Sequence, residues 1–296
     1  MTAPPFDLAA TGPLEAIAEV LRQRPALVLT GAGMSTRSGI PDYRGPDGTR
    51  RVAPMHYSEF LASSQARQRY WARSFVGWRR FSAARPNAAH HLVTELQRLG
   101  AVGDVITQNV DGLHQAAGTE RVVELHGSLA DVLCLACGTR ERRADLDARM
   151  AAQNPGFDVD SEEIRPDGDV RLEQVQVEAF EQPRCRVCSS DLLKPDVVFF
   201  GGSVDKALVQ RCFALTDAAP SLLVLGSSLQ VMSGLRFVRR AAKNGVPVAL
   251  VTRGDSRGDD LVTYKVDGEL APALERIADR LALAERPGGA KGDQLA

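Results

Sequence analysis

The chain has 296 residues, of which 44% are hydrophobic and 25% charged, with a formal net charge of −1. This balance is ordinary for a globular protein, and it excludes a broadly basic surface for nucleic acid or an anionic membrane. The apolar runs are too short to cross a bilayer, and the first nineteen residues carry acidic groups but no Lys or Arg. We therefore expect a cytoplasmic protein without a signal or transit peptide and without nucleic-acid or membrane partners.

The elements expected along the chain predict an α/β fold. A helix over 13–24 leads into a buried strand over 26–30 that ends in a glycine turn, and residues 55–81 are aromatic, basic and helical in character. Further strands are expected over 102–107, 122–125, 222–225 and 246–252, with helices over 90–99, 207–215 and 235–244. Strands that alternate with helices predict a parallel, Rossmann-like sheet covered on both faces.

Four of the five cysteines form two C-x-x-C pairs, Cys134 with Cys137 and Cys185 with Cys188. Two residues between thiolates let both sulfurs face one ion, and two such pairs complete a tetrahedral site. Because four thiolates leave no position for water, we predict one structural Zn²⁺ rather than a catalytic one. The alternative is one redox-active pair with unrelated cysteines. Cys212 lies in an apolar helical pattern and is expected to be an ordinary buried thiol.

Residues 134–188 interrupt the strand–helix alternation, because this segment is polar, rich in turns and flanked by the cysteine pairs. We predict a smaller, inserted zinc-binding and helical domain. The predicted parts are a discontinuous Rossmann-like domain of 1–45, 82–127 and 196–285, a helical part of the small domain over 46–81, a zinc-binding module over 128–195 and a disordered tail over 286–296.

The turn after the first strand, residues 31–33, is half of a dinucleotide-binding motif. Glycines there let the backbone approach phosphate groups. The third glycine of G-x-G-x-x-G is missing, because Thr36 takes its place, and Arg50 and Arg51 stand where a dehydrogenase carries an acidic ribose ligand. The turn therefore indicates phosphate binding, and a dehydrogenase is the least favoured reading.

Polar groups gather in the loops that follow. Asp42 and Arg44 lie just beyond the glycine turn, where a carboxylate and a guanidinium would form a ligand clamp; a solvated loop is the alternative. The string 108–111, Gln-Asn-Val-Asp, directly follows a strand, at the end where parallel sheets bind ligands, although a structural turn is the alternative. His126 ends the next strand and is either catalytic or a satisfied core residue. We read His114 as a helix residue behind the 108–111 turn.

Several strings together resemble the sirtuin family of NAD⁺-dependent protein deacylases. They are GAGMSTRSGIPDYRG, TQNVDGLHQAAG, ELHGS, KPDVVFFG, LGSSLQV and the two C-x-x-C pairs, and they occur in family order between residues 13 and 285. RYWARSFVGWRRFS, ELHGSLADVLCLACG and the excursion that contains PDGD resemble class II, the class of human sirtuin 4 and its bacterial relatives.

The resemblance implies a reaction that converts acyl-lysine and NAD⁺ to lysine, nicotinamide and O-acyl-ADP-ribose, with acylated proteins or peptides as partners. Nicotinamide would leave first, and His126, the general base, would then accept a proton from the ribose hydroxyls. Ile40 and Asp111 would form the nicotinamide pocket, and residues 198–201 would pair with the peptide as an added strand. The NAD⁺ co-substrate would be bound by Gly31, Ala32, Gly33, Ser35, Ile40, Asp42, Tyr43, Arg44, Gln108, Asn109, Val110, Asp111, Gly226, Ser227, Ser228, Thr252, Gly254 and Asp267.

Two positions depart from the family pattern. Thr252 stands where members usually carry Asn, and Asp267 stands where many carry Cys beside the adenine, so both changes affect binding of the adenosine side. Two other functions compete with deacylation: transfer of ADP-ribose to a protein from the same site, and a non-catalytic NAD-sensing zinc-ribbon module. The joint presence of His126 and the 108–111 string argues against the non-catalytic module.

Overall fold

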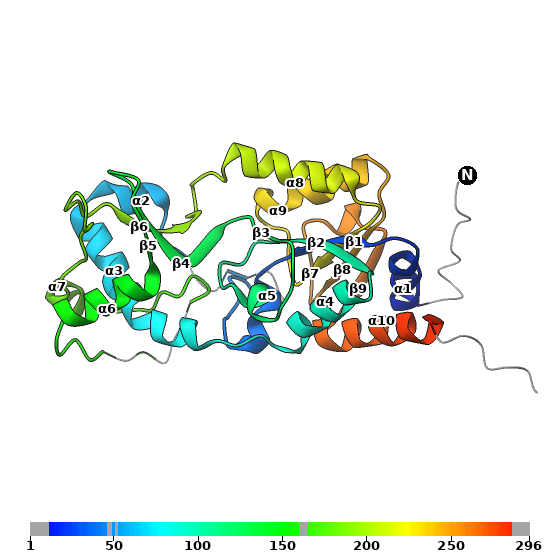
Figure 1. Cartoon of the computed structure of the whole chain (residues 1–296), viewed down its shortest axis with the longest axis horizontal. Coiled ribbons are helices and arrows are strands. Elements are labelled where there is room, and N and C mark those ends of the chain that lie inside the picture. The colour runs from blue at the N-terminus through cyan, green and yellow to red at the C-terminus, as the bar shows by residue number, and fades with distance from the viewer. Residues whose placement is uncertain (1–11, 46–48, 51–52, 160, 162–164, 286–296) are drawn as a thin grey trace, which may run out of the picture.

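The computed structural model describes residues 12–45, 49–50, 53–159, 161 and 165–285. The predicted tail over 286–296, the first eleven residues and positions 46–48, 51–52, 160 and 162–164 lie outside the described residues. In the described part, a six-stranded parallel sheet and a three-stranded antiparallel sheet lie side by side along the long axis of the molecule (Figure 1). This arrangement confirms the predicted Rossmann-like sheet with a smaller second domain.

The parallel sheet has the strand order β3-β2-β1-β7-β8-β9. Its strands are β1 (Ala26–Thr30), β2 (Val102–Thr107), β3 (Val122–Glu124), β7 (Leu222–Leu225), β8 (Val248–Thr252) and β9 (Tyr264–Asp267). Every residue of β1, β7 and β8 is buried, as expected of strands that are covered on both faces. The predicted strands agree with this sheet to within two residues, and β9 is the strand that the prediction missed.

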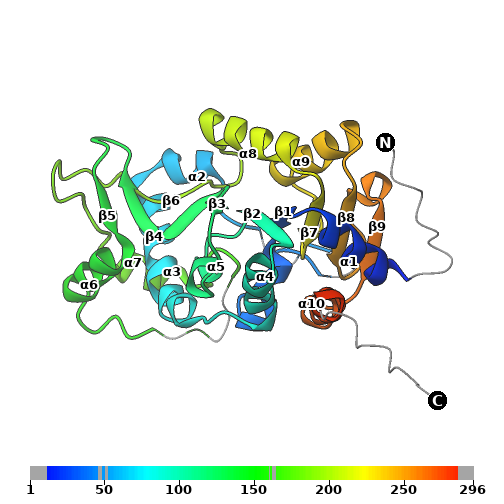
Figure 2. The ribbon, with the colours of Figure 1, turned by 45° about the vertical axis from the view of Figure 1, so that its right-hand side comes forward.

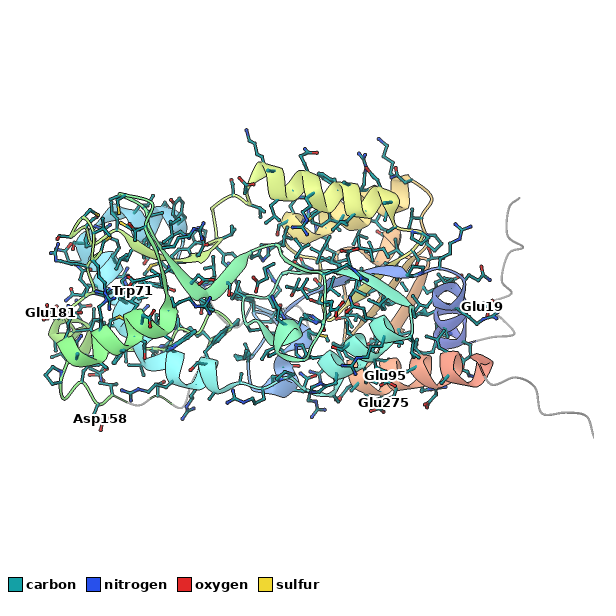
Figure 3. All side chains as sticks on the ribbon, in the orientation of Figure 1. Glu19, Trp71, Glu95, Asp158, Glu181 and Glu275 are labelled. Carbon is teal, nitrogen blue, oxygen red and sulfur yellow. The ribbon has the colours of Figure 1, made fainter. Side chains whose placement is uncertain are left out.

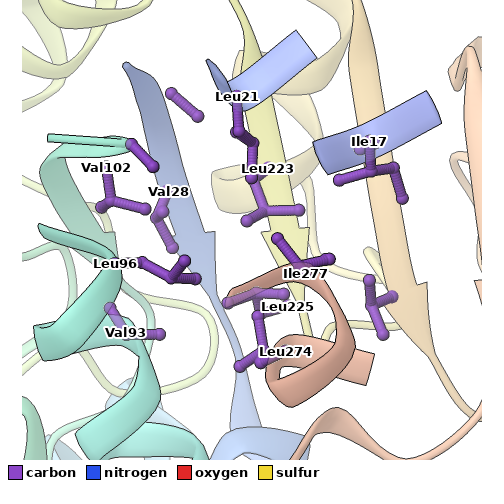
Figure 4. Close-up of a cluster of buried hydrophobic side chains, with 14 of the residues drawn as sticks. Ile17, Leu21, Val28, Val93, Leu96, Val102, Leu223, Leu225, Leu274 and Ile277 are labelled. Atoms are coloured by element: carbon purple, nitrogen blue, oxygen red, sulfur yellow. The ribbon is translucent and has the colours of Figure 1, made fainter. Parts of the chain in front are cut away.

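Helices cover both faces of this sheet, with α8 and α9 on one side and α1, α4 and α10 on the other (Figures 1 and 2). They are α1 (Pro13–Gln23), α4 (Ala88–Arg98), α8 (Lys206–Ala218), α9 (Met232–Lys243) and α10 (Leu270–Glu285). Successive strand residues point to opposite faces. Val28 therefore packs in the cluster of Ile17 and Ile277 shown in Figure 4, while Leu27 and Leu29 pack in the cluster that contains α9.

Polar side chains cap the helices that border the sheet. At the start of α4, the Asn87 side chain accepts a hydrogen bond from Ala89 N–H (2.9 Å), and His90 Nδ1 accepts one from Asn87 N–H (3.3 Å). This capping box explains why α4 begins two residues before the predicted start at 90. Asp205 caps α8 in the same way by accepting from Leu208 N–H at 3.0 Å.

The second part of the molecule has its own core. It consists of β4 (Gly127–Cys134), β5 (Arg140–Arg142), β6 (Leu193–Val197), α2 (Tyr57–Ala62), α3 (Ser64–Ala83), α6 (Arg143–Gln153) and α7 (Gln174–Ala179). Trp71 lies in this core, at the opposite end of the molecule from Glu19 of α1 (Figure 3). Leu146 and Met150, one turn apart on α6, pack in the same core. We read 134–188 as polar and turn-rich and predicted no helix within it, and α6 and α7 correct that reading.

The elements of the second part lie within 57–83 and 127–197. The predicted domain limits, 46–81 and 128–195, remain a prediction. Among the described helices, even the longest, α3, lacks the apolar length to cross a bilayer.

Helix α3 packs directly on the excursion that precedes α7. A Cβ atom added at Gly77 would lie 2.1 Å from the carbonyl oxygen of Gly168, which is far inside van der Waals contact. Gly168 itself has φ +71° and lies against the ring of Phe81. The two segments therefore approach each other at a distance that only glycine at 77 allows.

We expect Gly77→Ala to destabilise the protein. Alanine gains up to about 1 kcal/mol over glycine in a helix, but forcing a methyl group against a fixed backbone carbonyl costs about 1–3 kcal/mol. The net expectation is a lower midpoint of urea unfolding, with Ser82→Ala at the exposed end of the same helix as the control. A midpoint at or above that of the unsubstituted protein would contradict this packing.

Candidate active site

A cavity of about 1080 Å³ lies where the carboxyl ends of the parallel strands face the second part of the molecule. The loops after β1, β2, β7 and β8 line it on one side, and residues 197–204 line it on the other. Carboxyl ends of parallel strands are the usual ligand-binding edge of such sheets. The volume is at the upper end of the range for ligand pockets, about 300–1,000 Å³, so an extended ligand fits.

The glycine turn after β1 approaches the backbone of the loop after β7 very closely. Gly33 N–H donates to Gly226 O at 2.9 Å, and a Cβ added at Gly33 would lie 2.9 Å from that oxygen. Gly226 has φ +60°, and a Cβ added there would lie 2.6 Å from Met34 N. Two short 3₁₀ turns, η1 (Ala32–Met34) and η2 (Thr36–Ser38), follow in place of a longer helix. Bare backbone therefore borders the cavity here, which suits a phosphate group.

The polar string after β2 is held by a network that reaches back to this turn. Asp111 Oδ2 accepts from the Ser35 hydroxyl at 2.6 Å, and its Oδ1 accepts from Leu113 N–H at 2.9 Å. Asn109 Nδ2 donates to the same Ser35 oxygen at 3.0 Å. Burial raises the pKa of Asp111, and the bonds from Ser35 and Leu113 oppose that rise. The carboxylate is thus fixed in direction at the cavity wall.

His126 lies in the turn between β3 and β4, and both of its ring nitrogens have partners. Nδ1 lies 2.8 Å from the carbonyl oxygen of Gln108, and Nε2 lies 2.9 Å from the hydroxyl of Ser233. A carbonyl can only accept, so Nδ1 carries the proton and Nε2 presents its lone pair to the Ser233 hydroxyl. Burial lowers the pKa of His126, the Gln108 bond raises it, and the nearby Arg236 cation lowers it.

A buried layer supports these loops from behind. Thr30 Oγ1 donates to Thr107 Oγ1 at 2.8 Å and lies 3.1 Å from His114 Nε2, so the ends of β1 and β2 are bonded through side chains. His114 belongs to α5 (Leu113–Ala116), as predicted, and packs against His90. Burial lowers the pKa of His114 to about 4 and that of His90 to about 3, so both rings are neutral at pH 7 and structural.

The cavity gathers nearly all the residues predicted to bind the co-substrate, together with His126. Those in its lining are Gly31, Ala32, Gly33, Ser35, Ile40, Asp42, Tyr43, Arg44, Gln108, Asn109, Val110, Asp111, Gly226, Ser227, Ser228 and Thr252. Gly254 and Asp267 are not in the lining. Instead, Asp267 Oδ1 accepts from Gly254 N–H at 2.9 Å, so this pair holds the loop after β8 in shape.

The first turn of α9 supplies residues that the sequence did not reveal. Ser233 bonds to His126, Arg236 lines the cavity, and a Cβ added at Gly234 would lie 2.6 Å from Gln108 Oε1. We predicted this helix from 235 onward because the apolar pattern starts there, whereas α9 begins at Met232. None of these three residues lies in one of the motifs that we recognised in the sequence. Only an earlier predicted start of this helix would have brought them to attention.

The four paired cysteines form a compact cluster in the second part. Their sulfur atoms all lie within 4.8 Å of one another, with 3.6 Å between Cys134 and Cys188 and 3.7 Å between Cys137 and Cys185. Tetrahedral coordination with Zn–S bonds of about 2.3 Å places sulfurs about 3.8 Å apart, which fits these distances. The four thiolates are therefore placed to bind one zinc ion, as the spacing predicted.

The two C-x-x-C turns have the same backbone geometry. Cys134 N–H donates to Thr139 O (2.8 Å) and its carbonyl accepts from Gly138 N–H (2.9 Å). Cys185 N–H donates to Ser190 O (2.8 Å) and its carbonyl accepts from Ser189 N–H (2.9 Å). Two turns with the same hydrogen-bond pattern, whose four sulfurs lie within 4.8 Å of one another, favour a shared metal over a lone redox pair. Cys212 is buried on α8, away from this cluster, as expected.

Comparison with known proteins agrees with this geometry. The model of the Sir2 family matches residues 31–233. "NAD-dependent protein deacetylase 1" of Streptomyces coelicolor is 54% identical and covers 92% of this chain and 91% of its own length. A protein of the same name from Corynebacterium efficiens is 47% identical and covers 91% of this chain and 98% of its own length. A solved structure described as Sir2 with a p53 peptide and NAD⁺ is 28% identical, with a TM-score of 0.73, over 91% of this chain and 99% of that chain.

We expect Cys185→Ala to lose the metal and to disrupt the second part of the molecule. A structural zinc site contributes on the order of 10 kcal/mol to folding, so three remaining thiolates should not retain it. The measurements are zinc content by mass spectrometry and thermal unfolding, with Cys212→Ala as the cysteine control outside the cluster. A Cys185→Ala protein that keeps one ion per chain and its melting temperature would rule out a four-cysteine structural site.

Proposed function

The chain belongs to the Sir2 family, and from that premise we propose that it is an NAD⁺-dependent protein-lysine deacylase. One observation carries the proposal: the turn at 31–33, the Asp111 carboxylate and the His126 imidazole all border the same cavity. Its substrates are NAD⁺ and acylated proteins or peptides, and its products are free lysine, nicotinamide and O-acyl-ADP-ribose. When bound, NAD⁺ supplies the ribose carbon that accepts the acyl oxygen.

The glycine cradle supports binding of a dinucleotide at this edge. Side chains at Gly33 and Gly226 would clash with the facing loop, so the absence of Cβ atoms is what lets the two loops meet and lets a pyrophosphate approach their backbone closely. Arg44 in the cavity lining adds a positive charge suited to the same group. On the adenosine side Thr252 remains in the lining and offers one hydroxyl, with fewer hydrogen bonds than an amide would give.

The nicotinamide end would lie against Asp111 and Ile40. Ile40 is 4% exposed and packs beside Val110 and Leu113, which makes a dry wall. Asp111 stands at the polar end of that wall, where Ser35 fixes its orientation and a carboxamide N–H could donate to it. A dry wall with one oriented acceptor is suited to a flat aromatic amide.

His126 would act as the general base. Its Nδ1–H is committed to the Gln108 carbonyl, so Nε2 is the nitrogen that can accept a proton from a ribose hydroxyl. The lowered pKa keeps that nitrogen unprotonated at neutral pH. Substrate positioning and exclusion of water would supply much of the remaining catalysis.

The peptide would bind along residues 198–201. Val198 N–H donates to His126 O at 2.8 Å, and Phe200 O accepts from Tyr57 N–H at 2.8 Å, so this segment is fixed directly beside the proposed catalytic histidine. An added strand on such a segment would bring its acyl-lysine toward the base. All four residues of the segment line the cavity.

Two finer assignments also belong to the proposal. We assign the chain to class II, the class of sirtuin 4, because its two class-typical segments meet where Gly77 of RYWARSFVGWRRFS touches Gly168 of PDGD. We also propose a cytoplasmic location, which the composition and the bacterial origin of the relatives support.

We expect His126→Ala to abolish deacylation while NAD⁺ binding is largely retained. Loss of a general base lowers turnover by about a hundredfold or more, whereas the 31–33 cradle does not depend on the imidazole. The measurements are deacylated peptide and O-acyl-ADP-ribose by mass spectrometry, and NAD⁺ affinity by calorimetry. Retained turnover by His126→Ala would remove His126 from the mechanism. For the unsubstituted protein, ADP-ribose on protein without deacylated peptide would favour the transferase. Absence of nicotinamide release by that protein would favour a non-catalytic module.

The pH dependence should follow the lowered pKa of His126. The base is active when neutral, so kcat/KM for deacylation is expected to stay level from pH 8 to below the usual histidine value of about 6.5 and to fall only at lower pH. Arg236→Gln removes a charge that disfavours the imidazolium, so it should move the acidic limb to higher pH. An acidic limb centred above 6.5 in the unsubstituted protein would contradict this environment.

A further inference from the structure

We propose that Ser233 is a positioning residue for deacylation, whose hydroxyl keeps the reactive nitrogen of His126 directed into the cavity before NAD⁺ binds. The inference rests on the proposed role of His126 as general base. It adds a residue from the start of α9 that neither the glycine turn nor the 108–111 string contains.

The hydrogen bonds of His126 fix the plane of its ring. One bond joins Nδ1 to Gln108 O at 2.8 Å, and the other joins Nε2 to Ser233 Oγ at 2.9 Å, so the two atoms are held from opposite edges of the imidazole. A turn of the ring about its Cβ–Cγ bond would direct Nε2 away from the cavity, and without Ser233 only the Gln108 bond would oppose it. Ser233 supplies the second point of attachment that prevents this rotation.

The two partners of the histidine are themselves packed together. A Cβ added at Gly234 would lie 2.6 Å from Oε1 and 2.8 Å from Cδ of Gln108, so the first turn of α9 rests directly on the Gln108 side chain. Gln108 Nε2 also donates to Ser227 Oγ at 2.9 Å and to Thr30 O at 3.2 Å. A shift of Ser233 relative to Gln108 is thereby restricted, and both ends of the ring are held by one rigid unit.

The position of the Ser233 hydroxyl also shows where a substrate hydroxyl must come. Nε2 has a single lone pair, and Ser233, which lines the cavity and is half-buried, donates to it in the absence of substrate. A ribose hydroxyl that enters the cavity takes over this lone pair, and the ring needs no reorientation when it does. Ser233 therefore acts by preorganising the base and does not itself take part in bond making.

The test compares Ser233→Ala with Ser233→Thr, which keeps the hydroxyl, and with Ser82→Ala, an exposed serine at the end of α3 that is not part of the cavity lining. For each protein, kcat and KM for NAD⁺ are measured with an acetyl-lysine peptide, and nicotinamide exchange is measured with labelled nicotinamide. Exchange requires departure and return of nicotinamide but not the base. We expect Ser233→Ala to lower kcat for deacylation by about threefold to tenfold, the effect of one hydrogen bond, with exchange and KM for NAD⁺ nearly unchanged.

Ser233→Thr should restore most of the lost rate, and Ser82→Ala should behave like the unsubstituted protein. Unchanged or faster deacylation by Ser233→Ala would overturn the inference, as would an equal loss of exchange and deacylation, because Ser233 would then shape the NAD⁺ site instead of the base.

A second readout separates this inference from the proposed function. The ¹⁵N resonance of His126 Nε2, recorded without substrate, should move in Ser233→Ala and remain in place in Ser233→Thr and Ser82→Ala. Deacylation by the unsubstituted protein with an unaltered Nε2 resonance in Ser233→Ala would defeat only the role of Ser233. A shifted resonance in a protein that does not deacylate would confirm the bond and defeat the proposed function.

Discussion

The contact on which the site depends is the backbone approach between Gly33 and Gly226. It brings the loops after β1 and β7 within hydrogen-bond distance, at 2.9 Å, and neither side has room for a Cβ atom. The loop after β2 is then tied to both, because the Gln108 amide donates to Thr30 O and to Ser227. Three loops from neighbouring strands thereby become one wall. A side chain at either glycine would separate them and disrupt the bonds that cross the gap.

The features that could be predicted from the sequence are those that follow a local or periodic pattern. Five-residue buried strands, C-x-x-C spacing and the polar string after β2 each follow from a local rule, and the structure contains the strands and the four-sulfur cluster in the predicted places. The helix α6 escaped prediction because its polar face dominates its composition, and Leu146 and Met150 are the apolar residues of this helix that pack in the core, beside the buried Arg143. The strand β9 escaped because all its residues are at least partly exposed at the sheet edge, so its pattern lacks a buried run.

The site was harder to predict wherever a contact joins distant parts of the chain. Ser233 reaches His126 across 107 positions of sequence, and no periodic pattern encodes such a distance. Gly234 looks like a poor helix residue from the sequence, since glycine is unfavourable inside helices. The structure explains its presence, because the Gln108 amide occupies the space that a side chain would need. Asp267 differs in the opposite way. We predicted that it binds the co-substrate, whereas its carboxylate accepts a hydrogen bond from Gly254 N–H.

The zinc cluster lies away from the cavity, yet the same strands connect them. The strand β4 runs from Gly127, the neighbour of His126, to Cys134 of the cysteine cluster. The strand β6 pairs antiparallel with it from Leu193 opposite Cys134 to Val197 opposite Gly127, with a register shift between Ser128 and Val132. One end of this ribbon would therefore be fastened by a bound zinc ion, and the other leads to His126, the proposed base, and to residues 198–201, the proposed peptide segment. The buried Lys194 ammonium adds bonds to Pro195 O and Val197 O at that second end. A one-residue slip between paired strands would turn every side chain to the opposite face, so zinc bound at Cys134 would hold the register of β4 and β6 from Cys134 to Val132, beyond which the pairing shifts before Val198 meets His126.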